Sequence, residues 1–473
     1  MSLLWHDYET FGVDPRSDWP AQFAALRTDF QLRQIAPSTT LYCRPPRDYL
    51  PRVQACLLHG ISPQLCLAEG LPEPDFAKAI HQALATPGTI SAGYNSIRFD
   101  EEFSRQLFWR NFYDVYAREW ENGNGRFDLL DPLRMAYALR PEGLQWPMDK
   151  GKVSFRLTAM SAANGLAHAR AHDALEDVKA TIALARLLCR AQPKLWEHAL
   201  ALRNKALVLR LLDVKAQIPV VHVSQRFAAE RGCLAVVLPI CVHPSRRNEI
   251  IVFDLSQTPD ALLELGAEEI ADRLFVSEQD LPEGEARLAL KTVHTNRAPM
   301  LAPLSVLLSC DHARLKLDLP RCLRHAEQIR ACPQLVDTLR QVYLAAQPSA
   351  AVHNGEPELY AGLLGGADRT LLARVRNCAL PALGQVQFGF TDPRLATLLW
   401  RYRCRNYPDT LSPAEQRAWH SECAKRLSYG GSGDGMNVDR YFAEIQSARA
   451  NARELSQLDL FDQLEAYGRE LIC

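Results

Sequence analysis

The first 190 residues alternate between strand-like and helix-like stretches, and that order admits few folds. Short apolar runs of strand length come first, and strands and helices then interleave. This order predicts an α/β sheet with helices packed against it. The expected strands are 2–10, 22–30, 39–45 and 88–95, and the expected helices are 74–85, 100–120, 128–139, 155–165 and 174–188.

The rest of the chain divides into a β-rich part and a helical part. Short apolar runs with turn residues between them predict a small β barrel or sandwich, with a helical insert at 259–275. Residues 347–358 are typical of a linker, and the glycine-rich stretch 429–436 predicts a flexible loop between helices. The expected strands are 220–227, 233–242, 249–255 and 289–296, and the later helices are expected from Asp318 to the linker and over 394–406, 413–427 and 438–471.

Length and composition restrict the class of protein. The chain has 473 residues, which is too long for one core and suggests about three domains. Its formal net charge of −1 neither proposes nor excludes a nucleic-acid partner. The 13 cysteines contain no C-x-x-C pair, so we expect reduced thiols in the cytoplasm. The longest apolar stretch, 233–242, is half a membrane span, so we expect no membrane segment.

Asp7 and Glu9, in the stretch HDYET of the first expected strand, are the first candidate site residues. Residues i and i+2 of a strand share a face and stand about 7 Å apart. Two carboxylates this close repel each other unless an arginine or lysine, a shared proton or a divalent metal ion lies between them. A solvated strand end is the alternative interpretation.

Asp100 follows the fourth expected strand, at the start of a helix. Side chains at this junction of a βα unit commonly reach a ligand. The alternative is a helix cap, a position that aspartate often occupies.

The stretch HDALED adds His172 and Asp177 near the start of the helix expected at 174–188. Asp173 is the expected N-cap, so Asp177 lies about one turn inside the helix and His172 lies just outside it. A surface histidine in a loop is the alternative for His172 alone. A D-x-E strand, a later aspartate and an H-x4-D helix start, in this order, form a specific combination.

With these motifs the sequence resembles the DEDDh family of 3′ to 5′ exonucleases. HDYET is similar to the first family motif, YNSIRFD to the second and HDALED to the third. The resemblance implies that Asp7, Glu9, Asp100 and Asp177 bind two metal ions and that His172 takes the proton of the attacking water. Oxygen ligands favour Mg²⁺, for which Mn²⁺ can substitute.

The resemblance continues through the chain to the bacterial exodeoxyribonuclease I family. The stretches FWRNFYDVYA, YALRPEG, SFRLTAM, KTVHTNRAPML and YRCRNYPDTL are similar to sequences of that family. It implies a ribonuclease H-like α/β exonuclease domain at 1–190, an SH3-like β-rich domain at 191–348 and a C-terminal helical domain at 349–473. The implied activity is processive 3′ to 5′ degradation of single-stranded DNA to 5′-mononucleotides, in DNA repair and recombination.

The same resemblance implies contacts with DNA and with a protein partner. Arg140 and Arg314 are expected at the rim of a pocket for the acidic, hydrophobic C-terminal tail of single-stranded DNA-binding protein. We expect a monomer. Lys291, His294 and Arg297 are candidates for the wall of a groove that closes over single-stranded DNA. A solvated strand face is an equal alternative for these three residues. The expected substrate contacts are Glu9, Arg105, Tyr116, Trp120, Arg134 and Arg156.

Two other functions fit part of this sequence. An RNA-trimming exonuclease of the DEDDh family would have the same motifs, but such enzymes resemble only the first 190 residues. A non-catalytic scaffold that binds single strands would have no reason to retain repelling carboxylates.

Overall fold

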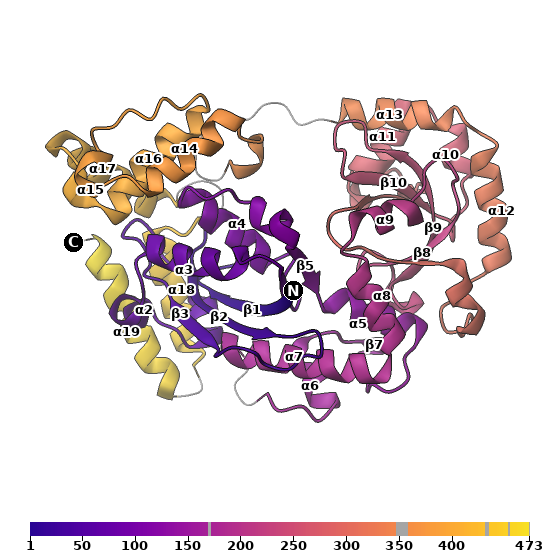
Figure 1. Cartoon of the computed structure of the whole chain (residues 1–473), viewed down its shortest axis with the longest axis horizontal. Coiled ribbons are helices and arrows are strands. Elements are labelled where there is room, and N and C mark those ends of the chain that lie inside the picture. The colour runs from indigo at the N-terminus through magenta and orange to yellow at the C-terminus, as the bar shows by residue number, and fades with distance from the viewer. Residues whose placement is uncertain (169–171, 347–357, 431–434, 453–454, 473) are drawn as a thin grey trace. The chain divides into compact units, whose positions relative to one another are not determined.

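The computed structural model describes residues 1–168, 172–346, 358–430, 435–452 and 455–472. The chain forms two compact units, whose elements are labelled in Figure 1. The first unit contains Met1–Gly125, His168–Ile182 and Ala350–Cys473, and the second contains Arg126–Ala167 and Ala183–Ser349. Compactness does not follow chain order, so the domain limits 1–190, 191–348 and 349–473 stay predictions.

Strands β3, β2, β1 and β4 of the first unit lie side by side in that order. β1 pairs with β2 in antiparallel and with β4 in parallel orientation. Leu3, Leu4 and Trp5 of β1 are successive residues that point to alternate faces, and all three are buried, so both faces of the sheet are covered here. The four predicted strands are confirmed as β1 (Ser2–Thr10), β2 (Pro20–Thr28), β3 (Thr39–Tyr42) and β4 (Thr89–Gly93).

The helix predicted over 100–120 is wrong in its second half. α4 ends at Arg110, and Phe112 has a φ of 59°. The buried Phe112 ring lies 5.4 Å from the ring of Tyr402, so tertiary packing holds it outside helical geometry. The helices of this part are α1 (Val53–His59), α2 (Pro63–Glu69), α3 (Glu73–Ala85), α4 (Asp100–Arg110) and the short 3-10 helices Ala117–Glu119 and Glu121–Gly123.

The C-terminal helices share two apolar cores with the first part of the chain. Leu395 and Leu398 pack in one core with Phe108, and Tyr441 and Phe461 pack in the other with Phe11. Helices α18 and α19, drawn in yellow in Figure 1, lie beside α1 and α2. The bounds are η6 (Leu359–Ala361), α14 (Gly366–Arg376), α15 (Leu380–Leu383), α16 (Pro393–Asn406), η7 (Pro408–Thr410), α17 (Pro413–Tyr429), α18 (Val438–Ala450) and α19 (Leu455–Ile472).

The second unit contains an antiparallel sheet of order β11-β10-β9-β8-β12, which confirms the predicted β-rich part. The sequence did not predict β12, because Pro299 and Pro303 border it and proline is rare within strands. The strands are β8 (Val220–Val223), β9 (Leu234–Val242), β10 (Glu249–Asp254), β11 (Leu290–His294) and β12 (Met300–Pro303).

Along the chain, helices precede and follow the strands of this sheet. A small hairpin of β6 (Met148–Asp149) and β7 (Lys152–Val153) precedes α6. β5 (Gly125–Asp128) and α7 (Ala174–Ala191) each have residues in both units. The helices are α5 (Leu130–Leu139), α6 (Leu157–Ala163), α8 (Pro193–Ala201), α9 (Lys205–Leu211), α10 (Asp260–Glu264), α11 (Ala267–Phe275), α12 (Leu319–Arg330) and α13 (Leu335–Ala345).

Two predicted segments fall partly outside the described residues. They are the linker at 347–358, of which 347–357 are not described, and the glycine-rich loop, of which 431–434 are not described. Across the described part of the chain, no helix has both the length and the apolar composition needed to cross a bilayer.

A candidate metal centre

The end of strand β1 presents Asp7 and Glu9 on one face of the sheet, as the strand period predicts. Asp7 lies opposite Ala24 of β2, and Glu9 lies opposite Gln22. On its other edge, β1 pairs with β4 only as far as Trp5. The two carboxylates therefore lie beyond the point where β4 leaves the sheet.

The Asp100 side chain hydrogen-bonds to β1 just beyond the last residue that pairs with β4. The Tyr8 backbone N–H, beyond the last pair with β4, donates to Asp100 Oδ1 at 2.9 Å. Asp100 is buried and is the first residue of α4, whose N-cap position is occupied by Phe99. The alternative that Asp100 caps its helix is therefore wrong, since its carboxylate bonds to the strand that carries Asp7 and Glu9.

The start of α7 brings His172 and Asp177 to the same place. Asp173 caps the helix as predicted, because its Oδ1 accepts from the backbone N–H groups of Leu175 at 3.1 Å and Glu176 at 3.2 Å. His172 has a φ of 66°, which is uncommon for a residue with a β-carbon. Backbone strain of this kind is concentrated at functional sites.

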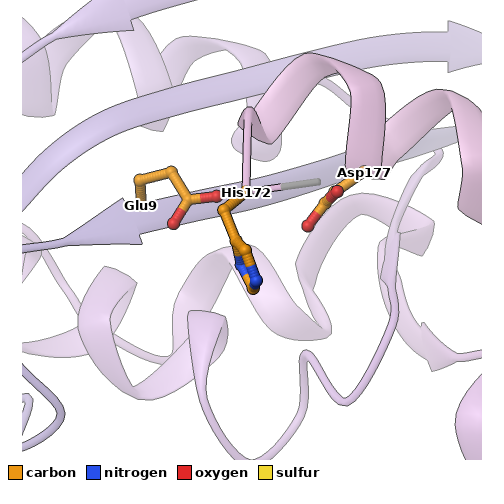
Figure 2. Close-up of side chains that lie close together, drawn as sticks. All are labelled: Glu9, His172 and Asp177. Atoms are coloured by element: carbon orange, nitrogen blue, oxygen red, sulfur yellow. The ribbon is translucent and has the colours of Figure 1, made fainter. Parts of the chain in front are cut away.

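Glu9, His172 and Asp177 form a compact group of possible metal ligands. One ligand atom of each lies within 4.8 Å of the ligand atoms of the other two. Figure 2 shows the His172 ring between the carboxylates of Glu9 on the strand and Asp177 on the helix. Glu9 is far from His172 and Asp177 in the sequence and meets them only through the fold.

The carboxylates of this site repel one another. Burial, followed by the charges of Asp100, Glu9 and Asp177, raises the pKa of Asp7 well above its ordinary value. Burial and the neighbouring carboxylates of Asp177 and Asp100 raise the pKa of Glu9 to about 8. Burial also raises the pKa of Asp177, although His168 and His172 oppose this shift.

These raised pKa values fit a site for divalent cations. A cation held between the carboxylates would offset both their mutual repulsion and their loss of hydration. Carboxylate oxygens are the ligands that Mg²⁺ and Mn²⁺ prefer. The ligand atoms that converge here are those of Glu9, His172 and Asp177, and the ligand set of Asp7, Glu9, Asp100 and Asp177 stays a prediction.

Sequence reasoning missed two histidines next to this group. His168 Nε2 donates to Asp177 Oδ1 at 2.5 Å. His59 contacts the end of β1 through Nε2, which lies 3.2 Å from Thr10 O, and burial together with the nearby His172 lowers the pKa of His59 to about 4. The only signal in the sequence is that His168 lies four residues before His172.

The expected DNA-contact residues Trp120, Tyr116 and Arg105 of the first unit differ in their exposure to solvent. Trp120 is 66% exposed, and Tyr116 is half-buried. Arg105 is buried, and its guanidinium donates to Glu119 at 2.7 Å and to Glu102 at 2.7 Å. Arg105 also stacks over the Tyr116 ring, 5.3 Å from its centroid. Their contact with DNA stays a prediction.

The remaining expected contacts lie in the second unit. Arg134 is buried, paired with Asp131 and stacked over Phe155, whereas Arg156 is exposed at the start of α6. Arg140 and Arg314 both bond to backbone carbonyls, Arg140 to that of Val306 and Arg314 to that of Ala138. Their roles in binding DNA or a partner stay predictions.

Comparisons with known proteins match this organisation along the chain. A family model described as Exonuclease matches residues 4–185, the Exonuclease I SH3-like domain matches 203–345 and the Exonuclease I C-terminal domain matches 353–471. Exodeoxyribonuclease I of Escherichia coli K12 is 42% identical over 419 residues, 88% of each chain.

Solved structures agree with the sequence matches. Exonuclease I from Methylocaldum szegediense is 45% identical, covers 100% of both chains and has a TM-score of 0.95. The zinc-bound complex of Escherichia coli exonuclease I with single-stranded DNA is 39% identical, covers 100% of this chain and 99% of that one, and has a TM-score of 0.93.

The fold and the matched exonuclease domain define this protein as an exonuclease. The two further domain models and the full-length relatives narrow the class. The chain belongs to the exonuclease I family, whose curated members are exodeoxyribonucleases. The predicted fold class, an exonuclease domain followed by an SH3-like and a helical domain, is confirmed.

Proposed function

We propose that this protein degrades single-stranded DNA processively from its 3′ end and releases 5′-mononucleotides. The observation that carries the proposal is the convergence of Glu9, His172 and Asp177 within 4.8 Å of one another, with Asp100 bonded to β1 between Asp7 and Glu9. The relatives support the substrate, because a similar exonuclease I was solved with single-stranded DNA.

In this proposal the four carboxylates hold two Mg²⁺ ions, for which Mn²⁺ can substitute, and these ions would stabilise charge on the scissile phosphate. His172 takes a proton from the attacking water, since a neutral imidazole has a ring nitrogen that can accept a proton. Asp100, fixed by the Tyr8 N–H, holds its oxygen toward the end of β1.

Trp120 is the strongest candidate for a base-stacking contact. A side chain as large as tryptophan that is 66% exposed can stack on an unpaired base without displacing protein neighbours. Arg105, Tyr116, Arg134 and Arg156 complete the proposed substrate contacts. Arg105 is already paired with Glu102 and Glu119. Its proposed role is therefore to hold the Tyr116 ring in the position where it contacts the DNA strand.

The proposed protein partner is the acidic, hydrophobic C-terminal tail of single-stranded DNA-binding protein. Arg140 and Arg314 both lie near the C-terminal end of α5, where Arg314 donates to the Ala138 carbonyl. Leu308 is 86% exposed and lies in the 3-10 helix η5 (Leu304–Ser309), in which the Val306 carbonyl accepts from Arg140. An exposed leucine with neighbouring arginines fits a tail that is both apolar and acidic. We propose a monomer that acts in the cytoplasm, in DNA repair and recombination.

The test is release of mononucleotides from a 5′-labelled single-stranded DNA oligomer in Mg²⁺, beside the same sequence as duplex DNA and as RNA. A ladder that shortens from the 3′ end on single-stranded DNA alone supports the proposal. Equal or faster digestion of RNA would replace it with RNA trimming. Binding without digestion in either Mg²⁺ or Mn²⁺ would replace it with a scaffold.

A further inference from the structure

Gln22 is a buried polar residue next to the candidate metal centre to which no role has been assigned. It lies on β2 between two strands, opposite Glu9 of β1 and opposite Tyr42 of β3. Paired residues of neighbouring strands point to the same face, so Gln22 shares the face of Asp7 and Glu9. Only 3% of Gln22 is exposed, and a buried amide needs hydrogen-bond partners.

Both ends of the Gln22 amide have partners. Its Oε1 accepts from the Ala174 backbone N–H at 3.1 Å, and its Nε2 donates to the Tyr42 hydroxyl at 3.2 Å. Ala174 offers only a donor, so the amide atom facing it must be the oxygen. The orientation of the amide therefore follows from its surroundings.

Ala174 is the first residue of α7, where the leading N–H groups have no acceptor within the helix. The Asp173 side chain accepts from Leu175 and Glu176, and the Asp173 carbonyl accepts from Asp177 at 3.0 Å. The Ala174 N–H has no acceptor among these groups of Asp173. Gln22, which lies on strand β2 of the sheet, accepts its hydrogen bond. Gln22 thus completes the cap and fastens the helix start to the sheet.

We propose that Gln22 is a positioning residue of this nuclease, which holds the start of α7 and thereby His172 and Asp177 in register with Glu9. Ala174 lies two residues after His172 and three before Asp177, while Glu9 is the cross-strand neighbour of Gln22. A shift of the helix start along the sheet would separate ligand atoms that now lie within 4.8 Å of one another.

A neutral amide suits this position. Asp173 and Asp177 on α7 lie near Glu9 on β1, and ionised carboxylates this close repel one another. A lysine or arginine at position 22 would have no acceptor for the Ala174 N–H and would compete with a metal ion for the carboxylates. Glutamine opposes the repulsion with a hydrogen bond and leaves the carboxylates to the cation.

The inference rests on the proposed metal-dependent function, and its test measures metal binding and catalysis separately. Gln22→Met keeps the volume of the side chain and removes both hydrogen bonds. Gln106→Met is the matched control, because Gln106 is also buried and, among the described residues, its Nε2 has no hydrogen-bond partner. Each full-length variant is titrated with Mn²⁺ by calorimetry, and deuterium exchange is followed over the first turn of α7.

We expect Gln22→Met to raise the Kd for Mn²⁺ about tenfold, as loss of groups that orient metal ligands commonly does. At saturating Mn²⁺ its kcat on single-stranded DNA falls about tenfold while KM changes less than about threefold. The first turn of α7 exchanges faster, and Gln106→Met matches the wild type in all three measurements. A general loss of folding would instead lower binding and rate in both variants.

If Gln22→Met does not fold, Tyr42→Phe replaces it. That change removes only the hydrogen bond that orients the Gln22 amide, and we expect a rise of roughly twofold to tenfold in the Mn²⁺ Kd. Wild-type Mn²⁺ affinity and kcat in the folded Gln22→Met variant, or an equal loss in Gln106→Met, would overturn the inference. If the wild type binds Mn²⁺ but does not cleave DNA, the proposed function fails. The Mn²⁺ affinities and the exchange rates of the variants then still test whether Gln22 positions the start of α7.

Discussion

The imidazole of His168 donates from Nε2 to the Asp177 carboxylate at 2.5 Å. Only 6% of the His168 side chain and 15% of that of Asp177 are exposed. Histidines that hydrogen-bond a ligating carboxylate fix its orientation and its basicity. His168 is therefore the direct neighbour through which Asp177 is oriented toward Glu9 and His172.

Replacement of His168 should impair metal binding more than DNA binding. Because Asp177 loses the group that orients it, we expect His168→Ala to weaken Mn²⁺ binding about tenfold and to lower kcat by a similar factor. His168→Gln, which retains a donor, should recover part of both. Calorimetry with Mn²⁺ and single-turnover cleavage measure the two effects. Equal Mn²⁺ affinity in His168→Ala and the wild type would show that Asp177 does not depend on His168.

Removal of a metal-binding carboxylate should abolish cleavage. A metal ion contributes several kcal/mol to charge stabilisation, so Asp7→Asn and Asp177→Asn should each lose at least about a hundredfold in rate. Affinity for single-stranded DNA, measured by fluorescence anisotropy in EDTA, should stay within a few fold. Asp337→Asn is the matched control, because the Asp337 side chain is 76% exposed on α13. Normal cleavage by Asp177→Asn would refute the metal assignment.

Loss of the Trp120 ring should weaken DNA binding first. Stacking on a base is worth roughly 1 to 3 kcal/mol, so Trp120→Ala should raise the Kd for single-stranded DNA by roughly fivefold to a hundredfold. The single-turnover rate at saturating DNA should change little. Tyr429→Ala provides a comparison, since Tyr429 is an aromatic residue that is 83% exposed at the end of α17. An unchanged Kd for Trp120→Ala would remove this residue from the binding surface.

The metal-free protein should lose stability as the pH rises above neutrality. The folded state raises the pKa of Glu9 from its ordinary 4.5 to about 8, so between these values it binds more protons than the unfolded state does. The stabilisation from the protonated form is complete below about pH 4.5 and is lost as the pH rises through about 8.

Thermal unfolding in EDTA at pH 7 and pH 8.5 measures this effect. Wild-type Tm should fall over that interval more than the Tm of Glu9→Gln, which lacks the titrating group. Addition of Mg²⁺ should raise the wild-type Tm more at pH 8.5 than at pH 6, because a cation binds the ionised carboxylates. Parallel curves for the two proteins in EDTA would contradict the raised pKa of Glu9.

Local sequence patterns predicted those parts of the site that depend on neighbours along the chain. The strand period placed Asp7 and Glu9 on one face, and capping rules placed Asp173 at the start of α7. The resemblance to the family motifs then implied that Asp100 and His172 belong to the same site. The strand and capping inferences depend on residues a few positions apart, where backbone geometry alone fixes which side chains share a face.

Packing between distant segments decided the rest. The sequence pattern continued α4 to residue 120, whereas the helix ends at Arg110 and Phe112, with a φ of 59°, packs against Tyr402. The bond from Gln22 to Ala174 joins residues 152 positions apart.

From the amino-acid sequence alone it was possible to predict the faces of the strand carboxylates, the helix cap and the family of the chain. The bonds of His168 to Asp177, of the Tyr8 N–H to Asp100 and of the Ala174 N–H to Gln22 could be seen only in the folded chain. Periodicity and capping are properties of adjacent residues, whereas these bonds form only once the sheet and the helices have packed together.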